Sequence, residues 1–497
     1  MIETGGECIV THNRKRWWMS NIKTVVVARG DGIGPEIMDG TLEVLRNAGA
    51  KLDFEFIDIG EKLYTQGIST GISNDAWAAI RRHKVLFKAP ITTPQGKGYK
   101  SLNVTFRKAL GLFANVRPVS SFQPFVLGPN SKIDIVIVRE NEEDLYAGVE
   151  YRSTHNSYLS LKLLSRSGCE RIIRYAFEYA KINQRFKVTC VIKDNIMKIT
   201  DGLFHSVFKE VAKEYPMITA DSYIVDIGAA RIATKPEIFD VVVTLNLYGD
   251  ILSDIAAEVS GSVGLAGSSN IGSHYAMFEA VHGSAPDIAG KGIANPSGLL
   301  NASVLMLNHL GQQEVAANIY NAWLKTIEDG MHTADIFNDN SKQKLSTQEF
   351  IKTVISNLGS MPEQLKAVET TISKTITIPS IFDAKSAQKE MMGVDVYLMD
   401  HNSSPEEVAI LFNNADLNIS LKSIAQRGLL IWPTANTDNV TTDMMRLRFI
   451  KREGSSMIHR DISTVLELLQ QHGFEISLFH TLYKYDGVEG FSKTQGE

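Results

Sequence analysis

The chain has 497 residues, too many for one ordinary hydrophobic core, so two or three domains are expected. Hydrophobic residues make up 44% of it and charged residues 22%, as is typical of globular proteins. The net charge is −5 and there is no long basic block, which argues against nucleic-acid binding. No apolar run reaches about 18 residues, so no membrane span is expected. Three cysteines are too few for a disulfide framework and predict a reducing compartment.

The first 20 residues lack the apolar stretch of a signal peptide and carry only a short basic cluster, NRKR. We expect a disordered tail over residues 1–20, or a true start at Met19.

From residue 24, short runs rich in Val and Ile alternate with segments of helical periodicity. The runs are TVVVA (24–28), VTCVI (188–192) and DVVVTLNL (240–247). Such runs between helices predict strands buried on both faces, and therefore an α/β sheet. Gly30 and Gly32 begin a G-x-G-x-x-G pattern, but Pro35 stands at its third glycine. We therefore expect a tight turn there and no Rossmann dinucleotide site.

Three arginines and two small polar residues gather in, or soon after, the segment 92–117. They are Ser101, Asn103, Arg107, Arg117 and Arg139. The planar fork of arginine binds a carboxylate through two parallel hydrogen bonds, and a helix N-terminus adds free N–H groups. The pattern predicts a pocket for a small molecule with several carboxylates. On chemistry alone, surface arginines in ordinary salt bridges are an equal alternative.

Two carboxylates, Asp250 and Asp254, lie four residues apart at the start of a predicted helix. They would repel each other on one helix face, and a divalent cation with oxygen ligands, Mg²⁺ or Mn²⁺, would relieve the repulsion. The alternative is a pair of acids that interact with the helix dipole.

Lys193 ends a predicted strand. By default such a residue is a solvated lysine; it could act as a base if a metal and other cations lower its pKa.

Five segments, in order, resemble the β-decarboxylating dehydrogenases, the family of isocitrate, 3-isopropylmalate, homoisocitrate and tartrate dehydrogenases. The segments are 92–117, RENEEDLYAG (139–148), KDNIMKITDGLF (193–204), NLYGDILSD (246–254) and HGSAPDIAGKGIANPSG (282–298). The resemblance implies an isopropylmalate-dehydrogenase-like α/β core over 21–358. Its large domain would cover 21–120 and 280–358, and its small domain with an inter-subunit clasp 121–279.

The resemblance also implies a homodimer with shared active sites and a role for each matching residue. Tyr146 and Lys193 would be the acid/base pair, with Lys193 reaching across the dimer. The metal carboxylates would be Asp226, Asp250 and Asp254, with Asp226 supplied by the partner subunit. The substrate-binding residues would be Thr93, Ser101, Asn103, Arg107, Arg117, Arg139 and Asn195. The cofactor-binding residues would be Glu279, His282, Gly283, Ser284, Ala285, Asp287, Ile288, Asn295 and Asp335.

Among the family's substrates we expect isocitrate, oxidised to 2-oxoglutarate and CO₂ in the tricarboxylic acid cycle. Ser101 and Asn103 can donate to the third carboxylate, where isopropylmalate has an apolar branch. Homoisocitrate and 3-isopropylmalate dehydrogenases, and a non-catalytic regulatory subunit, are the alternatives; the intact set of acid/base and metal residues favours catalysis. We expect the bacterial cytoplasm, or the mitochondrial matrix in a eukaryote.

NAD is the expected cofactor and NADP the alternative. NADP-using members tend to place Lys-Tyr where this chain has Asp287 and Ile288. Acidic Asp287 and Asp335 would repel a 2′-phosphate, and Ala334 offers it no hydrogen bond.

Beyond the core, residues 359–385 read as a linker. Residues 386–497 then follow the order strand, helix, strand, strand, helix, strand, which predicts an α+β ferredoxin-like module. The module makes the chain similar to longer members with a C-terminal extension. It shows no cluster of catalytic groups, so subunit packing is its default role and ligand sensing the alternative.

Overall fold

The computed structural model describes residues 22–68, 70–93, 101–130, 132–369, 376, 386–399, 403–413, 417–434 and 442–494. The chain divides into two compact units. The first comprises Met1–Tyr146, Ser165–Ile192 and Phe204–Ser380, and the second Ala147–Leu164, Lys193–Leu203 and Ile381–Glu497. The predicted tail and much of the predicted linker lie outside the described residues.

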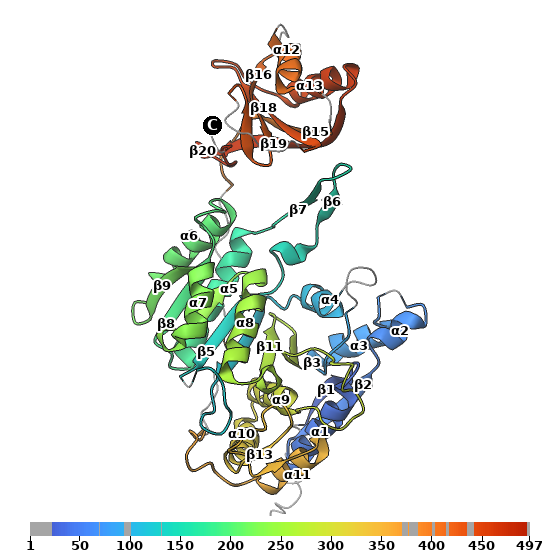
Figure 1. Cartoon of the computed structure of the whole chain (residues 1–497), viewed down its shortest axis with the longest axis vertical. Helices are drawn as coiled ribbons and strands as arrows, with labels where there is room; N and C mark the ends of the chain where they lie inside the picture. The colour runs from blue at the N-terminus through green and yellow to red at the C-terminus, as the bar shows by residue number, and fades with distance from the viewer. Residues whose placement is uncertain are drawn as a thin grey trace, which may run out of the picture. The chain divides into compact units, whose positions relative to one another are not determined.

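The first unit is built on one ten-stranded sheet (Figure 1). Its strands, in spatial order, are β2 (Leu52–Ile57), β1 (Lys23–Ala28), β3 (Val85–Lys88), β12 (Ala276–Ala280), β11 (Gly267–Ile271), β4 (Ala114–Ser120), β5 (Asp134–Glu140), β10 (Val241–Thr244), β8 (Lys187–Ile192) and β9 (Thr219–Ile224). Neighbours are parallel except where β11 pairs with β12 and β4, and where β4 pairs with β5. The four strands from β2 to β12 therefore run opposite to the four from β5 to β9.

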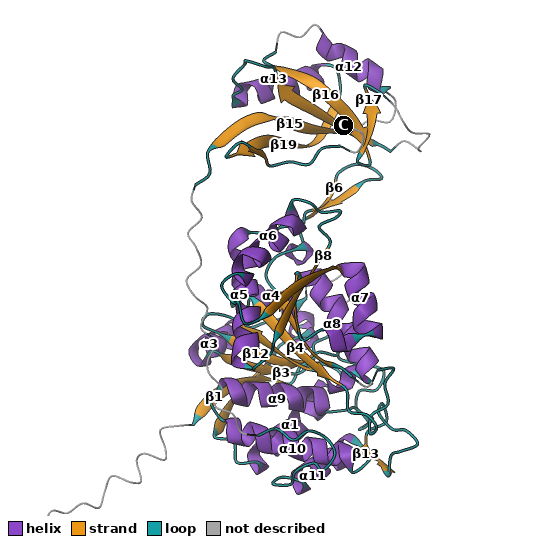
Figure 2. Cartoon of the chain, turned by 90° about the vertical axis from the view of Figure 1, so that its left-hand side faces the viewer, coloured by secondary structure: helices purple, strands orange, loops and turns teal. Residues whose placement is uncertain are grey.

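Helices cover both faces of the sheet, as the β-branched runs predict (Figure 2). In β1, Val25 and Val27 pack into one core cluster while Val26 and Ala28 pack into another. The first cluster holds α1 (Gly34–Asn47), α9 (Ser297–His309), α10 (Gln313–Glu328) and α11 (Thr347–Ser356). The second holds α3 (Asn74–His83) and α4 (Leu102–Ala109), with the short α2 (Glu61–Thr65) following β2.

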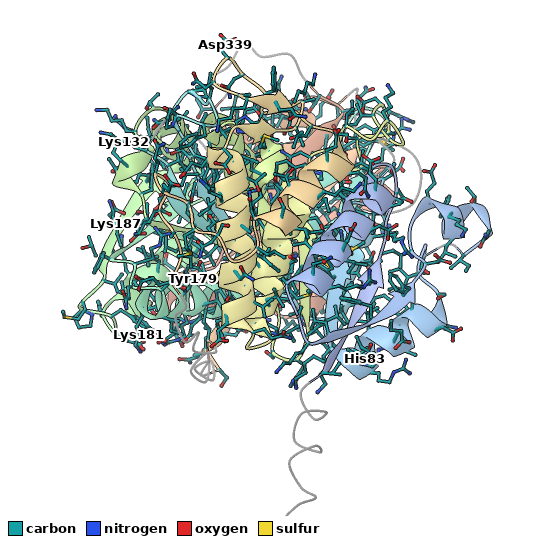
Figure 3. The ribbon with its side chains drawn as sticks, turned by 90° about the horizontal axis from the view of Figure 1, so that it is seen from below. His83, Lys132, Tyr179, Lys181, Lys187 and Asp339 are labelled. Atoms are coloured by element: carbon teal, nitrogen blue, oxygen red, sulfur yellow. The ribbon has the colours of Figure 1, made fainter. Side chains whose placement is uncertain are left out.

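The other half of the sheet has α7 (Val225–Thr234) and α8 (Asn246–Ser260) packed on β5, β8 and β10. The same strands also contact α5 (Arg166–Ile182), and α6 (Thr200–Ala212) follows β8. Two-residue strands β13 (Met331–His332) and β14 (Gln343–Lys344) form a separate pair. Charged side chains such as Lys132, Lys181 and Asp339 lie at the margin of this unit (Figure 3).

The glycine-rich segment after β1 is a tight turn, as predicted. Gly32 has a φ of +59°, and a Cβ there would lie 2.0 Å from the carbonyl oxygen of Ser284. The backbone N–H of Ile33 donates to the same oxygen at 2.9 Å. The turn therefore supports the loop at 282–285 through its bare backbone.

The second unit contains the C-terminal module. Its elements are β15 (Lys389–Met399), α12 (Pro405–Asn413), β16 (Ile419–Gln426), β17 (Leu429–Trp432), β18 (Met444–Lys451), α13 (His459–Gln471), β19 (Glu475–Tyr485) and β20 (Val488–Glu489). The sheet order is β17-β16-β18-β15-β19-β20. Without the edge strands β17 and β20, this is the antiparallel order of the predicted ferredoxin-like module. The second strand of the order predicted for the module, which the sequence suggests as one run over 417–433, is instead a hairpin, because Arg427 and Gly428 take positive φ values and turn the chain.

The second unit also contains a two-stranded hairpin of β6 (Glu150–Arg152) and β7 (Tyr158–Ser160). This hairpin falls within the region predicted to include the clasp. Among the described residues, no helix combines the length and the apolar character that crossing a bilayer requires.

Candidate active site

A pocket of about 330 Å³ gathers many of the predicted site residues in the first unit. The predicted residues that line it are Thr93, Ser101, Asn103, Arg107, Arg117, Tyr146, Asp250, Glu279, His282 and Gly283. All of them except Glu279, which lies on β12, come from four of the five segments that carry the family resemblance. The pocket therefore joins the predicted substrate residues to part of the predicted cofactor loop.

Helix α4 presents the polar residues of its first turn to this pocket. Ser101 is the N-cap residue, yet its side chain makes no capping hydrogen bond. Arg107 is buried and bonds to Glu279 at 3.1 Å. Among the described residues, neither Nε of Arg107 nor Oδ1 of Asn103 has a hydrogen-bond partner. Unpaired buried polar atoms are costly, and a polar ligand would satisfy them.

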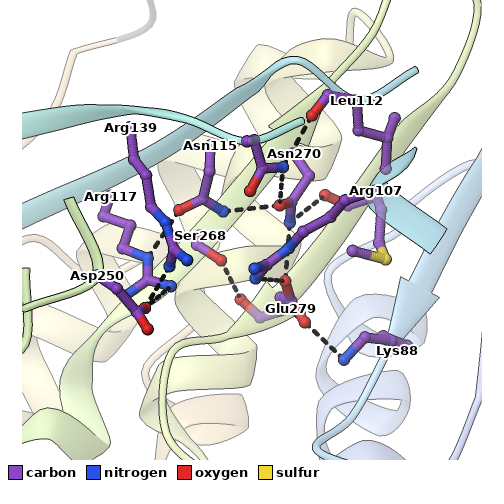
Figure 4. Close-up of polar contacts among 12 residues, drawn as sticks. Lys88, Arg107, Leu112, Asn115, Arg117, Arg139, Asp250, Ser268, Asn270 and Glu279 are labelled. Carbon is purple, nitrogen blue, oxygen red and sulfur yellow. Dashed lines mark hydrogen bonds and ion pairs between the residues drawn. The ribbon is translucent and has the colours of Figure 1, made fainter. Parts of the chain in front are cut away.

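The other two arginines come from adjacent antiparallel strands and converge on helix α8 (Figure 4). Arg117 on β4 donates to Asn115 at 2.7 Å, to Ser253 at 2.6 Å and to Asp250 at 3.2 Å. Arg139 on β5 is fully buried and donates to Asn246 at 3.0 and 2.9 Å and to Asp250. Gly249 of α8 packs against it, and a Cβ at that glycine would lie 2.5 Å from Cγ of Arg139.

The guanidinium groups are close enough to disturb one another. Burial, and then the charges of Arg117 and Arg107, lower the pKa of Arg139 to about 10. Burial also lowers the pKa of Arg117, with Arg107 contributing in the same direction. Arg139 nevertheless remains cationic at neutral pH. A pocket with this much buried positive charge favours an anionic ligand.

Asp250 is the acidic partner of this cluster and also holds the predicted acid. Burial raises its pKa, but Arg139 and Arg117 outweigh burial and keep that pKa below the usual value. The hydroxyl of Tyr146, in the 3-10 turn η1 (Leu145–Ala147), donates to Asp250 at 2.5 Å. Burial and this hydrogen bond raise the pKa of Tyr146, so its phenol is protonated at neutral pH and can donate a proton.

Sequence reasoning missed a buried ion pair at the opposite wall. Lys88 on β3 lies 2.5 Å from the carboxylate of Glu279 on β12, and both side chains are almost fully buried. Burial raises the pKa of Glu279, but Lys88 and Arg107 outweigh it and hold that pKa far below its usual range. The only signal for Lys88 in the sequence is a lysine that ends the apolar run VLFK (85–88).

A network of amides links Glu279 to the arginine strands (Figure 4). Asn270 on β11 donates to Glu279 at 2.9 Å and accepts from Asn115 on β4 at 2.7 Å. Asn115 in turn accepts from Arg117. Sequence reasoning did not single out either asparagine. The two halves of the sheet are thus connected through side chains at the antiparallel β11–β4 pair.

The predicted cofactor loop lies beside the pocket, and several of its side chains have internal partners. Burial lowers the pKa of His282, which is therefore neutral at pH 7, and its Nε2 has no partner among the described residues. Ser284 hydrogen-bonds to Thr92 at 2.8 Å. Asn295 donates to Asp335 at 3.0 Å and accepts from the N–H of Ser297 at the start of α9.

Four further residues of the predicted cofactor set differ in their surroundings. Gly283 is exposed at the pocket, and Ala285 takes a positive φ of 39°. Asp287 is exposed, whereas Ile288 packs against the main core cluster.

The predicted metal residues are only partly brought together. Asp250 and Asp254 occupy one face of α8, and Arg117 bridges them. Burial, with Asp250 as a further cause, raises the pKa of Asp254. Asp226 is exposed in the first turn of α7. Within the described part of the chain, no three His, Cys, Asp or Glu side chains form a group able to hold a metal ion.

Lys193 and Asn195 directly follow β8, in the second compact unit. The N–H of Lys193 donates to Asp201 at 2.8 Å, and Asn195 is exposed in the following turn. Neither residue, nor Asp226, is among the side chains that line the pocket. Their predicted reach into the active site of a partner subunit stays a prediction.

Comparison with known proteins places this arrangement in a family. Residues 24–354 match the model of the isocitrate/isopropylmalate dehydrogenases, and residues 389–497 match the bacterial isocitrate dehydrogenase C-terminal domain. The chain is 53% identical to "Isocitrate dehydrogenase [NADP]" of Rickettsia felis, over 96% of this chain and 100% of that protein. It is 39% identical to the protein of the same name from Thermus thermophilus, over 96% of each chain. A crystal structure, of the TT0538 protein from Thermus thermophilus, superposes with a TM-score of 0.89 at 38% identity, covering 95% of this chain and 96% of that one.

The chain therefore belongs to the isocitrate/isopropylmalate dehydrogenase family. Within the family it is a long member of the isocitrate dehydrogenase type, a decarboxylating oxidoreductase that uses a nicotinamide cofactor and a small tricarboxylate. The predicted fold class, a family core followed by a C-terminal sheet module, is confirmed.

The prediction that NAD is the favoured cofactor is wrong, because relatives matched over nearly the whole chain are named as NADP enzymes. The structure gives a physical reason. The carboxylate of Asp335 accepts from Ser262 at 2.8 Å, from Asn295 and from Thr333 at 2.6 Å. Asp287 is exposed, so water screens its charge. Neither acid therefore presents the desolvated negative charge on which the prediction depended.

Proposed function

We propose that the protein oxidises isocitrate and releases CO₂ to form 2-oxoglutarate, with NADP as hydride acceptor and Mg²⁺ or Mn²⁺ as metal. The observation that carries this proposal is a cluster of three buried arginines at one pocket: Arg107 and Arg117 line the pocket, and Arg139, which does not line it, pairs with the lining residue Asp250. Isocitrate is a trianion, so three guanidinium charges match three carboxylates in charge, and the planar fork of an arginine that lines the pocket suits a carboxylate in hydrogen-bond geometry.

The choice of substrate follows from polar side chains at the start of α4 that can donate hydrogen bonds to a ligand. Ser101, whose hydroxyl does not cap α4, and Asn103 line the pocket with Arg107, and each carries a hydrogen-bond donor. A third carboxylate can accept from the Ser101 hydroxyl and the Asn103 amide, whereas an isopropyl group would leave them unsatisfied. An unpaired buried polar group costs about 1–3 kcal/mol, so the pocket selects against the apolar branch.

Proton transfer falls to two residues of this chain. Lys193 takes the proton of the C2 hydroxyl as hydride leaves C2. The resulting β-keto acid loses its C3 carboxylate as CO₂, and Tyr146 protonates C3. The raised pKa of Tyr146 keeps it in the acid form that this step needs. Following the family resemblance, we assign Lys193 to the site of a partner subunit.

The carboxylates of α8 fit a hard divalent cation. Asp250 and Asp254 offer oxygen ligands on one helix face, and the raised pKa of Asp254 reports a carboxylate that would gain from a cation. Asp226 of a second subunit would complete the set. When bound there, the metal would act as a Lewis acid toward the substrate's hydroxyl and carboxylate.

The assignment of NADP is supported by the printed names of the relatives and by the chemistry of the loop at 282–298. Lys291 is exposed four residues after Asp287 and provides a cation on the same loop. Neutral His282, whose Nε2 has no described partner, suits contact with an adenine ring. When bound, the nicotinamide supplies the hydride acceptor, while the protein supplies position and electrostatics.

A homodimer is supported by an apolar surface beside the acids. Ile227 on α7 and Ile251 on α8 are each about half exposed, at 50% and 51%. Each follows directly after a predicted metal ligand, Asp226 or Asp250. Exposed isoleucines next to functional carboxylates indicate a surface that a second copy of the chain covers.

Steady-state rates with isocitrate and Mg²⁺, measured with NADP and with NAD, test the proposal. We expect a kcat/KM at least tenfold higher with NADP, and Lys291→Ala should raise the KM for NADP but not for NAD. Equal or faster turnover with NAD would refute the cofactor assignment. No turnover of isocitrate with either cofactor would refute the activity.

A further inference from the structure

The hairpin of β6 and β7 lacks the packing that would fix it by itself. All three residues of β6 are exposed, as are Tyr158 and Ser160 of β7. Two-stranded hairpins without a third strand or a covering helix are marginally stable in water. The position of this hairpin therefore depends on what binds its turn and its base.

The turn of the hairpin is bound by the C-terminal module. Asp443, which is buried just before β18, accepts from the N–H of Asn156 at 2.8 Å and from the hydroxyl of Ser157 at 2.8 Å. Ser477 on β19 donates to the carbonyl of Ser153 at 2.7 Å. Hydrogen bonds to a buried carboxylate are shorter and stronger than those between neutral groups, so this contact fixes the turn.

The base of the hairpin is bound to the segment that carries Lys193. Lys162, two residues after β7, lies 2.6 Å from Asp201, whose side chain is fully buried. The other oxygen of Asp201 accepts the backbone N–H of Lys193 at 2.8 Å. One buried carboxylate thus joins the end of the hairpin to the residue that we propose as the base.

We propose that Asp201, Lys162 and Asp443 are positioning residues for Lys193, so that the C-terminal module orients the base through the hairpin. The route is continuous: Asp443 holds the turn, the two strands carry that constraint to Lys162, and Lys162 with Asp201 fixes the backbone of Lys193. This gives the module a catalytic purpose beyond subunit packing. The kinetic part rests on the proposed role of Lys193; the mechanical coupling does not.

Amide hydrogen exchange of the full-length protein tests the coupling without any assay of activity. Asp443→Ala should increase exchange both in the turn at 153–157 and in the segment 193–203. Glu453→Ala removes an exposed carboxylate from the same module and should change neither. Exchange that rises in the turn alone, or in neither segment, would overturn the proposal. If Asp443→Ala does not fold, Asp443→Asn, which keeps the shape and one acceptor, replaces it.

Kinetics then test the positioning of Lys193. Asp443→Ala and Lys162→Met should each lower kcat by about tenfold while the KM for isocitrate changes less than about threefold, because a misplaced base slows chemistry and leaves binding intact. The kcat of the double variant should be no lower than that of the slower single variant, because both substitutions interrupt the same chain of contacts to Lys193. If the two losses of kcat multiplied in the double variant, the substitutions would act independently, and a single route from Asp443 to Lys193 would be refuted.

Lys193→Met separates this inference from the proposed function. If Lys193→Met retains activity, Lys193 is not the base, and the exchange results alone then decide whether the coupling exists. If Lys193→Met is inactive while kcat of Asp443→Ala is unchanged, the base assignment stands and the positioning role is refuted.

Discussion

The packing of Arg139 against Gly249 gives a prediction whose magnitude can be worked from the structure. In Gly249→Ala the new Cβ would lie 2.5 Å from Cγ and 2.7 Å from Cβ of Arg139. Ordinary carbon contacts are about 3.5–4.0 Å, so the two residues must separate by roughly 1 Å. Arg139 is fully buried, so it cannot relieve the contact by moving out into solvent.

A shift of that size would disrupt the hydrogen bonds from Arg139 to Asn246, now at 3.0 and 2.9 Å, and its ion pair with Asp250. Hydrogen bonds to charged groups contribute about 1.5–3 kcal/mol each. Losing one or two of them in the substrate complex corresponds to about 2–4 kcal/mol, or roughly a 30- to 1,000-fold fall in kcat/KM for isocitrate.

The assay is steady-state kinetics of Gly249→Ala beside Glu258→Ala, which changes an exposed side chain on the same helix. Glu258→Ala should keep wild-type kcat/KM. Thermal unfolding of both variants shows whether the loss is local to the site. A folded Gly249→Ala enzyme with kcat/KM within about threefold of wild type would refute the reasoning that Arg139 must hold its present position.

Three further predictions concern the ion pair, the acid and the metal. Lys88→Met should lower the unfolding free energy by about 3–5 kcal/mol, because it leaves Glu279 buried with one cation fewer. Since Lys88 and Arg107 depress the pKa of Glu279, its stabilisation is present above its ordinary value of 4.5 and is lost as pH falls. Lys88→Met should raise that pKa and move acid unfolding to higher pH; an unchanged acid transition would contradict this. Tyr146→Phe should reduce kcat by about 100-fold with little change in melting temperature, and a kcat near wild type would exclude Tyr146 as the acid. Chelation should abolish activity and Mg²⁺ restore it, with Asp254→Asn needing more Mg²⁺ for half-maximal rate; activity insensitive to chelation would exclude the metal.

The arginine cluster could be predicted from sequence because its members lie in short motifs that a known family shares. Little more than one helix and two strands separates the three arginines, Arg107, Arg117 and Arg139, along the chain. The pairing of β4 with β5 brings Arg117 and Arg139 together. The α/β architecture was predictable for a similar reason, since the alternation of β-branched runs and helices is a local signal.

The partners that lie far apart in the chain could not be predicted in this way. Lys88 meets Glu279 because β3 pairs with the distant strand β12, and no local pattern specifies that register. In the sequence Asp335 has the character of a free negative charge, but Ser262 and Asn295 occupy its carboxylate from distant segments. Asp443 binds the hairpin turn across 287 residues. Side-chain hydrogen bonds of this kind follow from tertiary structure alone.

The most direct test of the central claim, that the arginine pocket selects a tricarboxylate, is a comparison of kcat/KM for isocitrate and 3-isopropylmalate on the wild-type enzyme. The account predicts that isocitrate is favoured by at least about 100-fold, and that Ser101→Leu reduces the ratio by removing a donor to the third carboxylate. A wild-type enzyme that oxidises 3-isopropylmalate as fast as isocitrate would contradict it.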